Sequence, residues 1–217
     1  MTSSTVEDYL KRIYLEGGAA GVVPMGRLAE AARVAPGTAT AMAKALAGAG
    51  LADYAPYSGV RLTPDGCQVA LRTLRRHRLV ELLLVKVLGM DWAEVHEDAE
   101  RLEHAISDRL LERIDEVLGH PATDPHGDPI PTPQGRLPCA KLTRLAGAPM
   151  GVRWRVARIA DQSPDFLRAA AARGLRPGAA VEVRGRDDAA DTITVRCGRR
   201  EVVLGSTAAE KVFLRPG

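Results

Sequence analysis

The sequence predicts an α+β protein that begins with a winged helix-turn-helix, continues as an all-α segment and ends in a small β-barrel. Three observations predict this fold class. Apolar residues recur every three or four positions through the first half of the chain. A tight break separates two short helices, and two extended pieces follow them. From about residue 150 the apolar residues alternate as in strands, between glycine turns. The 217 residues suffice for two or three small domains.

The N-terminal part predicts three helices and a two-stranded wing. We expect the helices over residues 5–17, 25–33 and 38–49, with glycines ending the first and the third. The break between the second and third helices covers only residues 34–37. Residues 51–62 then form two extended pieces around a turn at residues 56–59. Helix, tight turn, helix and wing follow one another in the order of a winged helix-turn-helix.

In such a motif the second helix of the pair enters the DNA major groove with its N-terminal residues. Here those residues include the hydroxyls of Thr38 and Thr40, and Gly37 allows close approach of the backbone to phosphate. Further candidates for holding the DNA backbone are Arg27, Lys44, Tyr57, Ser58 and Arg61. Few side chains are suited to bidentate base contacts, so specificity could rest on DNA shape. The alternative is a helical hairpin used only for packing.

The middle of the chain predicts two long helices, over residues 64–88 and 92–118. Thr63 and Pro64 begin the first of them, and Gly89 ends it. Both helices have more apolar surface than a winged domain covers. A dimer seam is therefore expected, with a purely intrachain core as the alternative.

Residues 119–138 contain six prolines and predict an irregular strap rather than an element. Beyond it we expect strands over residues 152–159, 180–186, 192–197 and 201–204, with a possible fifth over 211–214. A helix-like stretch at residues 164–172 lies between the first two. Short strands with glycine turns suggest a small barrel.

Charge is unevenly distributed along the chain. The net charge is +4 over residues 1–78, −7 over residues 79–118 and +6 over residues 119–217. A basic head before an acidic middle suits a polyanion-binding part joined to a cation-binding part. The three cysteines are far apart, and no run of eighteen apolar residues or secretory signal is present. These features predict a cytoplasmic protein without a membrane span or a thiolate zinc site.

The acidic middle contains the spacing of a metal site. On a helix, Glu100, Glu103 and His104 share one face, and His96 lies one turn before Glu100. His77 and Glu81 are spaced by one turn on the preceding helix. Paired carboxylates repel unless a cation joins them, and Asp8 could close the site from the first helix. Oxygen and imidazole ligands suit Mn(II), Fe(II) or Zn(II). The alternative is a solvated acidic face with incidental histidines.

Several motifs together resemble the diphtheria-toxin-repressor/manganese-transport-regulator family over nearly the whole chain. They are Glu7-Asp8-Tyr9-Leu10, Thr63-Pro64-Asp65-Gly66, Arg76-His77-Arg78-Leu79, Val95-His96-Glu97 with Glu103-His104, and the run from Asp124 to Pro131. The resemblance implies a winged DNA-binding domain at residues 1–63 and a helical dimerisation and metal-binding domain at 64–120. A Pro-rich linker at 121–149 and an SH3-like domain at 150–217 would follow.

The resemblance also implies two metal sites in each subunit. The primary site would use Asp8, Glu100, Glu103 and His104. The ancillary site would use His77, Glu81 and His96, with Asp165 or Gln162 from the SH3-like domain and Asp124 or His126 from the strap. Carboxylates at positions 8 and 100, where the iron-responsive branch has Met and Cys, resemble the manganese branch. Lys11 departs from the compact manganese regulators, which have Glu there, so their closely spaced two-metal site is not expected.

The implied function is a non-enzymatic repressor that binds operator DNA as a homodimer when Mn(II) or, alternatively, Fe(II) is bound. A metallohydrolase is the main rival, but the sequence has no His-Glu-x-x-His, no Gly-x-Ser-x-Gly and no phosphate loop. A di-iron carboxylate protein would need Glu-x-x-His on two helices, and only one helix of this sequence has anything close to that motif. The third alternative is a DNA-binding protein that does not respond to metal.

Overall fold

The computed structural model describes residues 3–217, so the first two residues of the predicted domain 1–63 lie outside the described residues. The chain divides into two compact units. The first unit contains residues 3–77 together with Glu103–Ile106 and Pro131–Leu137, and the second contains Arg78–Leu102, Ser107–Ile130 and Pro138–Gly217. Helix α4 (Pro64–Lys86) supplies residues to both units.

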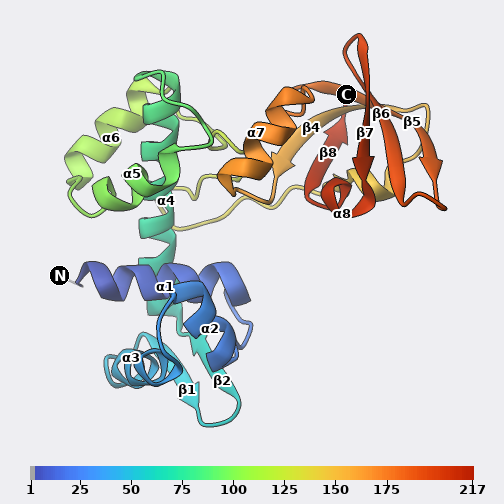
Figure 1. The fold of residues 1–217 in the computed structure, drawn as a ribbon. Helices are drawn as coiled ribbons and strands as arrows, with labels where there is room; N and C mark the ends of the chain where they lie inside the picture. Colours follow the sequence, from blue (N-terminus) through green and yellow to red (C-terminus); the bar gives the residue numbers. More distant parts are fainter. Residues whose placement is uncertain (1–2) are drawn as a thin grey trace. The chain divides into compact units, whose positions relative to one another are not determined.

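The first unit is a winged helix-turn-helix, as predicted (Figure 1). Its elements are α1 (Ser4–Gly17), α2 (Met25–Ala32), α3 (Pro36–Gly48), β1 (Ala52–Ala55), β2 (Gly59–Leu62) and the start of α4. Ser3 caps α1 by accepting a hydrogen bond from the Val6 amide. Pro36 takes the first helical position of α3, so this helix begins two residues before the predicted start. The core includes the fully buried Leu10, Ile13 and Leu28.

The helical part of the second unit differs from the prediction of one helix over residues 92–118. The structure has α5 (Val95–Leu102) and α6 (Asp108–Val117), separated by residues 103–107. Ser107 begins α6, because its hydroxyl accepts a hydrogen bond from the Leu110 amide at 3.3 Å. The apolar spacing continues across this break, so periodicity alone did not reveal it.

The C-terminal part is a six-stranded antiparallel sheet in the order β3-β8-β4-β5-β6-β7. Its elements are β3 (Thr143–Arg144), the 3₁₀ turn η1 (Leu145–Gly147), β4 (Arg153–Ile159), α7 (Pro164–Ala172), β5 (Ala180–Asp187), β6 (Thr192–Cys197), β7 (Arg200–Gly205), α8 (Ser206–Ala209) and β8 (Val212–Pro216). All five predicted strands and the helix are present, and β3 was not predicted. Bulges between Val156 and Arg158 and between Val183 and Gly185 bend the sheet.

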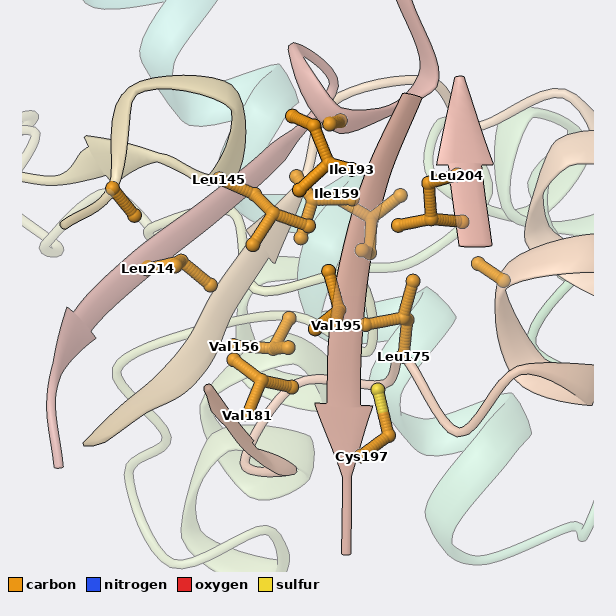
Figure 2. Close-up of a cluster of buried hydrophobic side chains, with 14 of the residues drawn as sticks. Leu145, Val156, Ile159, Leu175, Val181, Ile193, Val195, Cys197, Leu204 and Leu214 are labelled. Atoms are coloured by element: carbon orange, nitrogen blue, oxygen red, sulfur yellow. The ribbon is translucent and has the colours of Figure 1, made fainter. Parts of the chain in front are cut away.

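The bent sheet encloses a continuous apolar core (Figure 2). Val156 and Ile159 of β4, Val181 of β5 and Val195 of β6 point into it, and α7 adds Leu167. Trp92, which precedes α5, is buried in the same cluster. The sheet and the helical part of the second unit therefore share a core. Among the described residues, no helix combines the length and the apolar character that crossing a bilayer requires.

The strap between α6 and the sheet is irregular, as predicted, but it is partly buried. The backbone carbonyl of His126 accepts a hydrogen bond from the Ile159 amide at 2.9 Å, which attaches the strap to β4. Gly127 has a φ of +91°, and a Cβ there would lie 2.0 Å from the Ala157 carbonyl oxygen. Only glycine fits this close approach. The strap therefore holds its side chains at fixed positions beside the sheet.

Candidate metal centres and DNA-binding surface

Asp8, Glu103 and His104 form one group of possible metal ligands, which we call the first cluster. Each offers one ligand atom, and these atoms lie within 4.8 Å of one another. His104 Nε2 lies 3.0 Å from Asp8 Oδ1 and 3.3 Å from Glu103 Oε1. Asp8 comes from α1, and the other two come from the segment after α5, which belongs to the first unit. The break between α5 and α6 is thus what presents Glu103 and His104 to α1.

The hydrogen bonds of His104 favour its protonated form. Its Nδ1 lies 2.8 Å from Glu7 Oε2, while its Nε2 faces Asp8. Because carboxylates only accept, both ring nitrogens donate when both contacts are made. Burial alone would lower the pKa of His104, but the hydrogen bonds to Glu7 and Asp8 outweigh it and raise the pKa above its usual value. A cation bound at Nε2 would replace that proton.

Glu103 is completely buried, and both of its carboxylate oxygens have partners. His77 Nδ1 donates to Oε2 at 2.6 Å, and the Lys11 ammonium donates to Oε1 at 2.5 Å. Burial alone would raise the pKa of Glu103, but the hydrogen bond from His77 and the charges of His77 and Lys11 hold the pKa below its usual value. Glu103 is therefore ionised and available as an anionic ligand.

Glu100, the remaining residue of the predicted primary site, belongs to the second unit. It lies on the last turn of α5, about one third exposed, with its Oε1 3.7 Å from His96 Nε2. The sequence alone did not assign a role to Glu7, although Glu7 precedes Asp8 in the motif Glu7-Asp8-Tyr9-Leu10. Its contact with His104 joins residues 97 positions apart, which helical spacing cannot reveal.

Glu81, Asp124 and His126 form a second group of possible ligands, the second cluster, inside the second unit. All three are at least 96% buried, and charged side chains are rarely buried to this degree unless a partner compensates for the charge. His126 Nδ1 lies 3.8 Å from Glu81 Oε2 and 4.0 Å from Asp124 Oδ1. The strap thus brings two predicted residues, Asp124 and His126, to Glu81 of α4.

His126 has the orientation of a metal ligand. Its Nε2 donates to the Trp92 carbonyl oxygen at 2.8 Å, which leaves Nδ1 as the acceptor nitrogen of the neutral ring. Nδ1 is buried and has no hydrogen-bond partner among the described residues. A backbone carbonyl that fixes the tautomer of an imidazole is typical of metal-binding histidines. A divalent cation between Nδ1 and the two carboxylates would fit this arrangement.

The carboxyl group of Asp124 orders the strap, and its pKa is strongly raised. Its Oδ1 accepts hydrogen bonds from the amides of His126 and Asp128, at 2.8 and 3.0 Å. Burial, followed by the negative charges of Asp128 and Glu81, raises the pKa of Asp124 to about 8. Arg78 offsets part of this charge at 3.5 Å from Asp124 Oδ2. An added cation would relieve the remaining repulsion.

The other predicted ancillary ligands lie around Glu81 or apart from it. His96 Nδ1 lies 3.3 Å from Glu81 Oε1, so the two oxygens of Glu81 face different histidines. His77 lies one turn before Glu81 on α4. Gln162 donates to Asp128 Oδ2 at 2.7 Å, and Asp128, which sequence reasoning did not select, stands in the quoted strap motif. Asp165 has a fully exposed side chain and lies 3.5 Å from Arg168 of its own helix.

The predicted DNA-binding residues lie on α2, α3 and the wing. Gly37, Thr38 and Lys44 are exposed on α3, and the Thr40 hydroxyl donates to the Pro36 carbonyl oxygen. Tyr57 is fully exposed at the tip of the wing. A hollow of about 430 Å³ is lined by Lys44, Tyr57 and Ser58 together with Pro24, Met25, Tyr54, Pro56 and Gly59. Arg27 and Arg61 pair with Glu16 and Asp53, respectively.

Three family models match consecutive parts of the chain. The iron dependent repressor N-terminal DNA binding domain matches residues 1–60, and the iron dependent repressor metal binding and dimerisation domain matches residues 63–132. A FeoA domain matches residues 143–216. The matches are consistent with the predicted order of a DNA-binding domain, a helical domain and an SH3-like domain.

Relatives of similar length extend the likeness to the whole chain. The iron-dependent repressor IdeR of Mycobacterium leprae (strain TN) is 34% identical over 96% of this chain and 95% of its own. A manganese-dependent transcriptional repressor solved in complex with manganese is 40% identical, with a TM-score of 0.87 over 98% of this chain and all of its own. ScaR with bound zinc is 31% identical, with a TM-score of 0.79 over 98% and 99%.

Proposed function

Because the chain belongs to the iron-dependent repressor family of metal-dependent transcriptional repressors, we propose that it is a repressor activated by Mn(II). In this proposal the protein binds operator DNA as a homodimer when metal is bound, and it controls metal homeostasis. Fe(II) is the alternative activating ion, since the relative from Mycobacterium leprae is described as iron-dependent. The repressor relatives do not favour the metallohydrolase alternative.

The first cluster is the observation that carries this proposal. It joins α1 of the winged helix-turn-helix to Glu103 and His104, residues of the region that matches the metal binding and dimerisation model. We propose Asp8, Glu103 and His104 as primary ligands, with Glu100 as the fourth. When bound, the ion would neutralise these carboxylates and hold the side chains together. Because α1 packs on α2 and α2 packs on α3, fixing α1 constrains the helix proposed to enter the major groove.

The second cluster supports a second site in each subunit. We propose that Glu81, Asp124 and His126 bind the ancillary ion, and that His77 and His96 are further candidate ligands. The fixed tautomer of His126 and the burial of both carboxylates support this assignment. Gln162 would act through Asp128, to which it donates a hydrogen bond. Asp165 could take part only after its exposed side chain reorients.

The ligand types support manganese. Both clusters offer carboxylate oxygens and imidazole nitrogens, without a thiolate or a thioether in either. Hard oxygen donors suit Mn(II), whereas softer sulfur donors favour other ions. The similar structure that contains manganese is described as a manganese-dependent repressor, which agrees with this choice.

Binding to DNA across metal titrations tests the proposal. Manganese-loaded protein first selects the duplexes that it binds from a random pool, and a selected duplex is labelled as the probe. Fluorescence anisotropy then follows binding of the protein to this probe in chelator or at buffered free concentrations of Mn(II), anaerobic Fe(II) or Zn(II). We expect the protein to bind the probe only with metal. Because the coupling is reciprocal, the factor by which Mn(II) raises the affinity for the probe should equal the factor by which the probe raises the affinity for Mn(II), typically about 5- to 150-fold. Equal binding in chelator would indicate a metal-independent DNA-binding protein. Absence of binding under every condition would contradict the repressor function.

A further inference from the structure

Lys11 is a cationic side chain buried among the carboxylates of the first cluster. It lies on the inward face of α1 with Tyr9, Leu10 and Ile13, and it is only 4% exposed. Removing an ammonium group from water is costly unless a charged partner compensates for it. The partner is Glu103, whose Oε1 lies 2.5 Å from the Lys11 ammonium nitrogen. Lys11 is therefore part of the site rather than a surface residue near it.

Lys11 and the proposed metal site share one oxygen atom. Glu103 Oε1, which accepts from Lys11, also lies 3.3 Å from His104 Nε2. Asp8 Oδ1 lies 3.0 Å from the same imidazole nitrogen and 3.9 Å from the Lys11 ammonium. An ion bound by Asp8, Glu103 and His104 would therefore lie close to the positive charge of Lys11, which already interacts with the oxygen atoms that the ion would use. Two cations near one carboxylate repel each other, and this repulsion is strong in a buried site.

We propose that Lys11 is an internal counter-ion that stabilises Glu103 when no divalent ion is bound and thereby raises the metal concentration at which the first cluster fills. The proposal rests on the proposed function of that cluster as a metal site. It assigns Lys11 the role of setting the threshold of the response, without ligating the ion. The carboxylate of Glu103 would exchange part of its interaction with the ammonium for one with the ion.

Removing the charge should separate the two effects of Lys11. Lys11→Met keeps most of the length of the side chain, and Lys11→Arg keeps the charge. The exposed Lys141, changed to Met, controls for the loss of one positive charge elsewhere in the chain. All three substitutions are made in a His126→Ala background, which removes one proposed ligand of the second cluster. The probe is Mn(II) alone, followed by the loss of the electron paramagnetic resonance signal of the aqueous ion.

We expect Lys11→Met to melt at a lower temperature in chelator, because Glu103 loses the partner of its Oε1 atom and keeps only His77. The same variant should bind Mn(II) at least about tenfold more tightly, since charges within about 4–6 Å change proton affinities by about 10- to 1000-fold. Lys11→Arg should stay close to the background protein in both measurements, and so should Lys141→Met. Lys11→Gln replaces Lys11→Met if that variant does not fold.

Unchanged or weaker Mn(II) binding by the folded, uncharged variant would overturn the role of Lys11. Failure of the proposed function has a different signature. In that case the first cluster binds no Mn(II), so adding His104→Ala to the background protein would leave its Mn(II) binding unchanged. Tighter binding without a loss of melting temperature in chelator would also contradict the counter-ion role. The two readouts together distinguish a threshold-setting charge from a purely structural contact. Loss of a purely structural contact would lower both the melting temperature and the affinity for Mn(II).

Discussion

Glu103 is fully buried, and it contacts residues from two different helices. His77 of α4 donates to one carboxylate oxygen, and Lys11 of α1 donates to the other. His104, the next residue, contacts Glu7 and Asp8 of α1. Substitutions at these positions therefore affect ligands and supporting residues to different degrees.

We expect Glu103→Ala and His104→Ala to abolish metal-dependent binding to the enriched DNA probe. His77→Ala should weaken the response only in part, because His77 orients Glu103 through one hydrogen bond. Anisotropy across a Mn(II) titration measures all three variants, and the exposed Glu97, changed to Ala, is the control from the adjacent helix. A silent His77→Ala protein beside a normally responding His104→Ala protein would reverse these assignments.

Residues 8 and 100 should determine which ions the protein prefers. Combining Asp8→Met with Glu100→Cys replaces two oxygen donors of the proposed primary site with sulfur donors. We expect the ranking of activating ions to move from Mn(II) toward Fe(II) or softer ions. DNA binding at buffered free ion concentrations checks this, and an unchanged ranking would exclude both residues as ligands.

At the level of elements, sequence periodicity predicted most helices and strands but not where they end. The heptad-like spacing through residues 92–118 concealed the break after Leu102, although Ser107 was a visible capping residue. The pairing of His126 with Glu81 joins positions 45 apart, so local spacing could not predict it. Asp124 and His126 were instead identified through the resemblance of the strap motif, and the contacts of Glu7 and Lys11 required the fold.

The strap is an element whose conformation depends on one glycine. Gly127→Ala would place a Cβ 2.0 Å from the Ala157 carbonyl oxygen at a φ of +91°. Strain of this kind costs about 1–3 kcal/mol, so we expect a lower melting temperature and weaker metal binding at the second cluster. Gly147→Ala, which meets no atom within 4 Å, is the matched control. Equal melting temperatures for the two variants would show that the strap adapts.

At the scale of the whole molecule, apolar surface remains on the helical part of a single chain. Val87 and Leu88 follow α4, and Leu110 and Val117 lie on α6, each about half exposed or more. Such residues are expected at a dimer seam. Since these side chains are apolar whether or not an ion is bound, the seam should not depend on metal.

We therefore expect the protein to be a dimer in chelator as well as in Mn(II). Sedimentation velocity at micromolar concentration measures this directly. Replacing Leu110 and Val117 together by Asp should produce monomers, whereas replacing the exposed Val203 of β7 by Asp should not. A monomer in chelator that dimerises when Mn(II) is added would contradict a preformed seam and would make assembly itself the response to metal.

The stacking of Trp92 on His126 has an optical consequence. The two ring centroids lie 5.6 Å apart with an interplanar angle of 25°, and the imidazole Nδ1 faces the carboxylates of the second cluster. Indole emission responds to charge beside the ring, so an ion at this cluster should change the fluorescence of Trp92. Trp154, on β4, is the second tryptophan of the chain, and Trp154→Phe would leave Trp92 as the only tryptophan. Trp92 emission would thus be a label-free readout of ion binding at the second cluster, and this measurement does not require the DNA sequence.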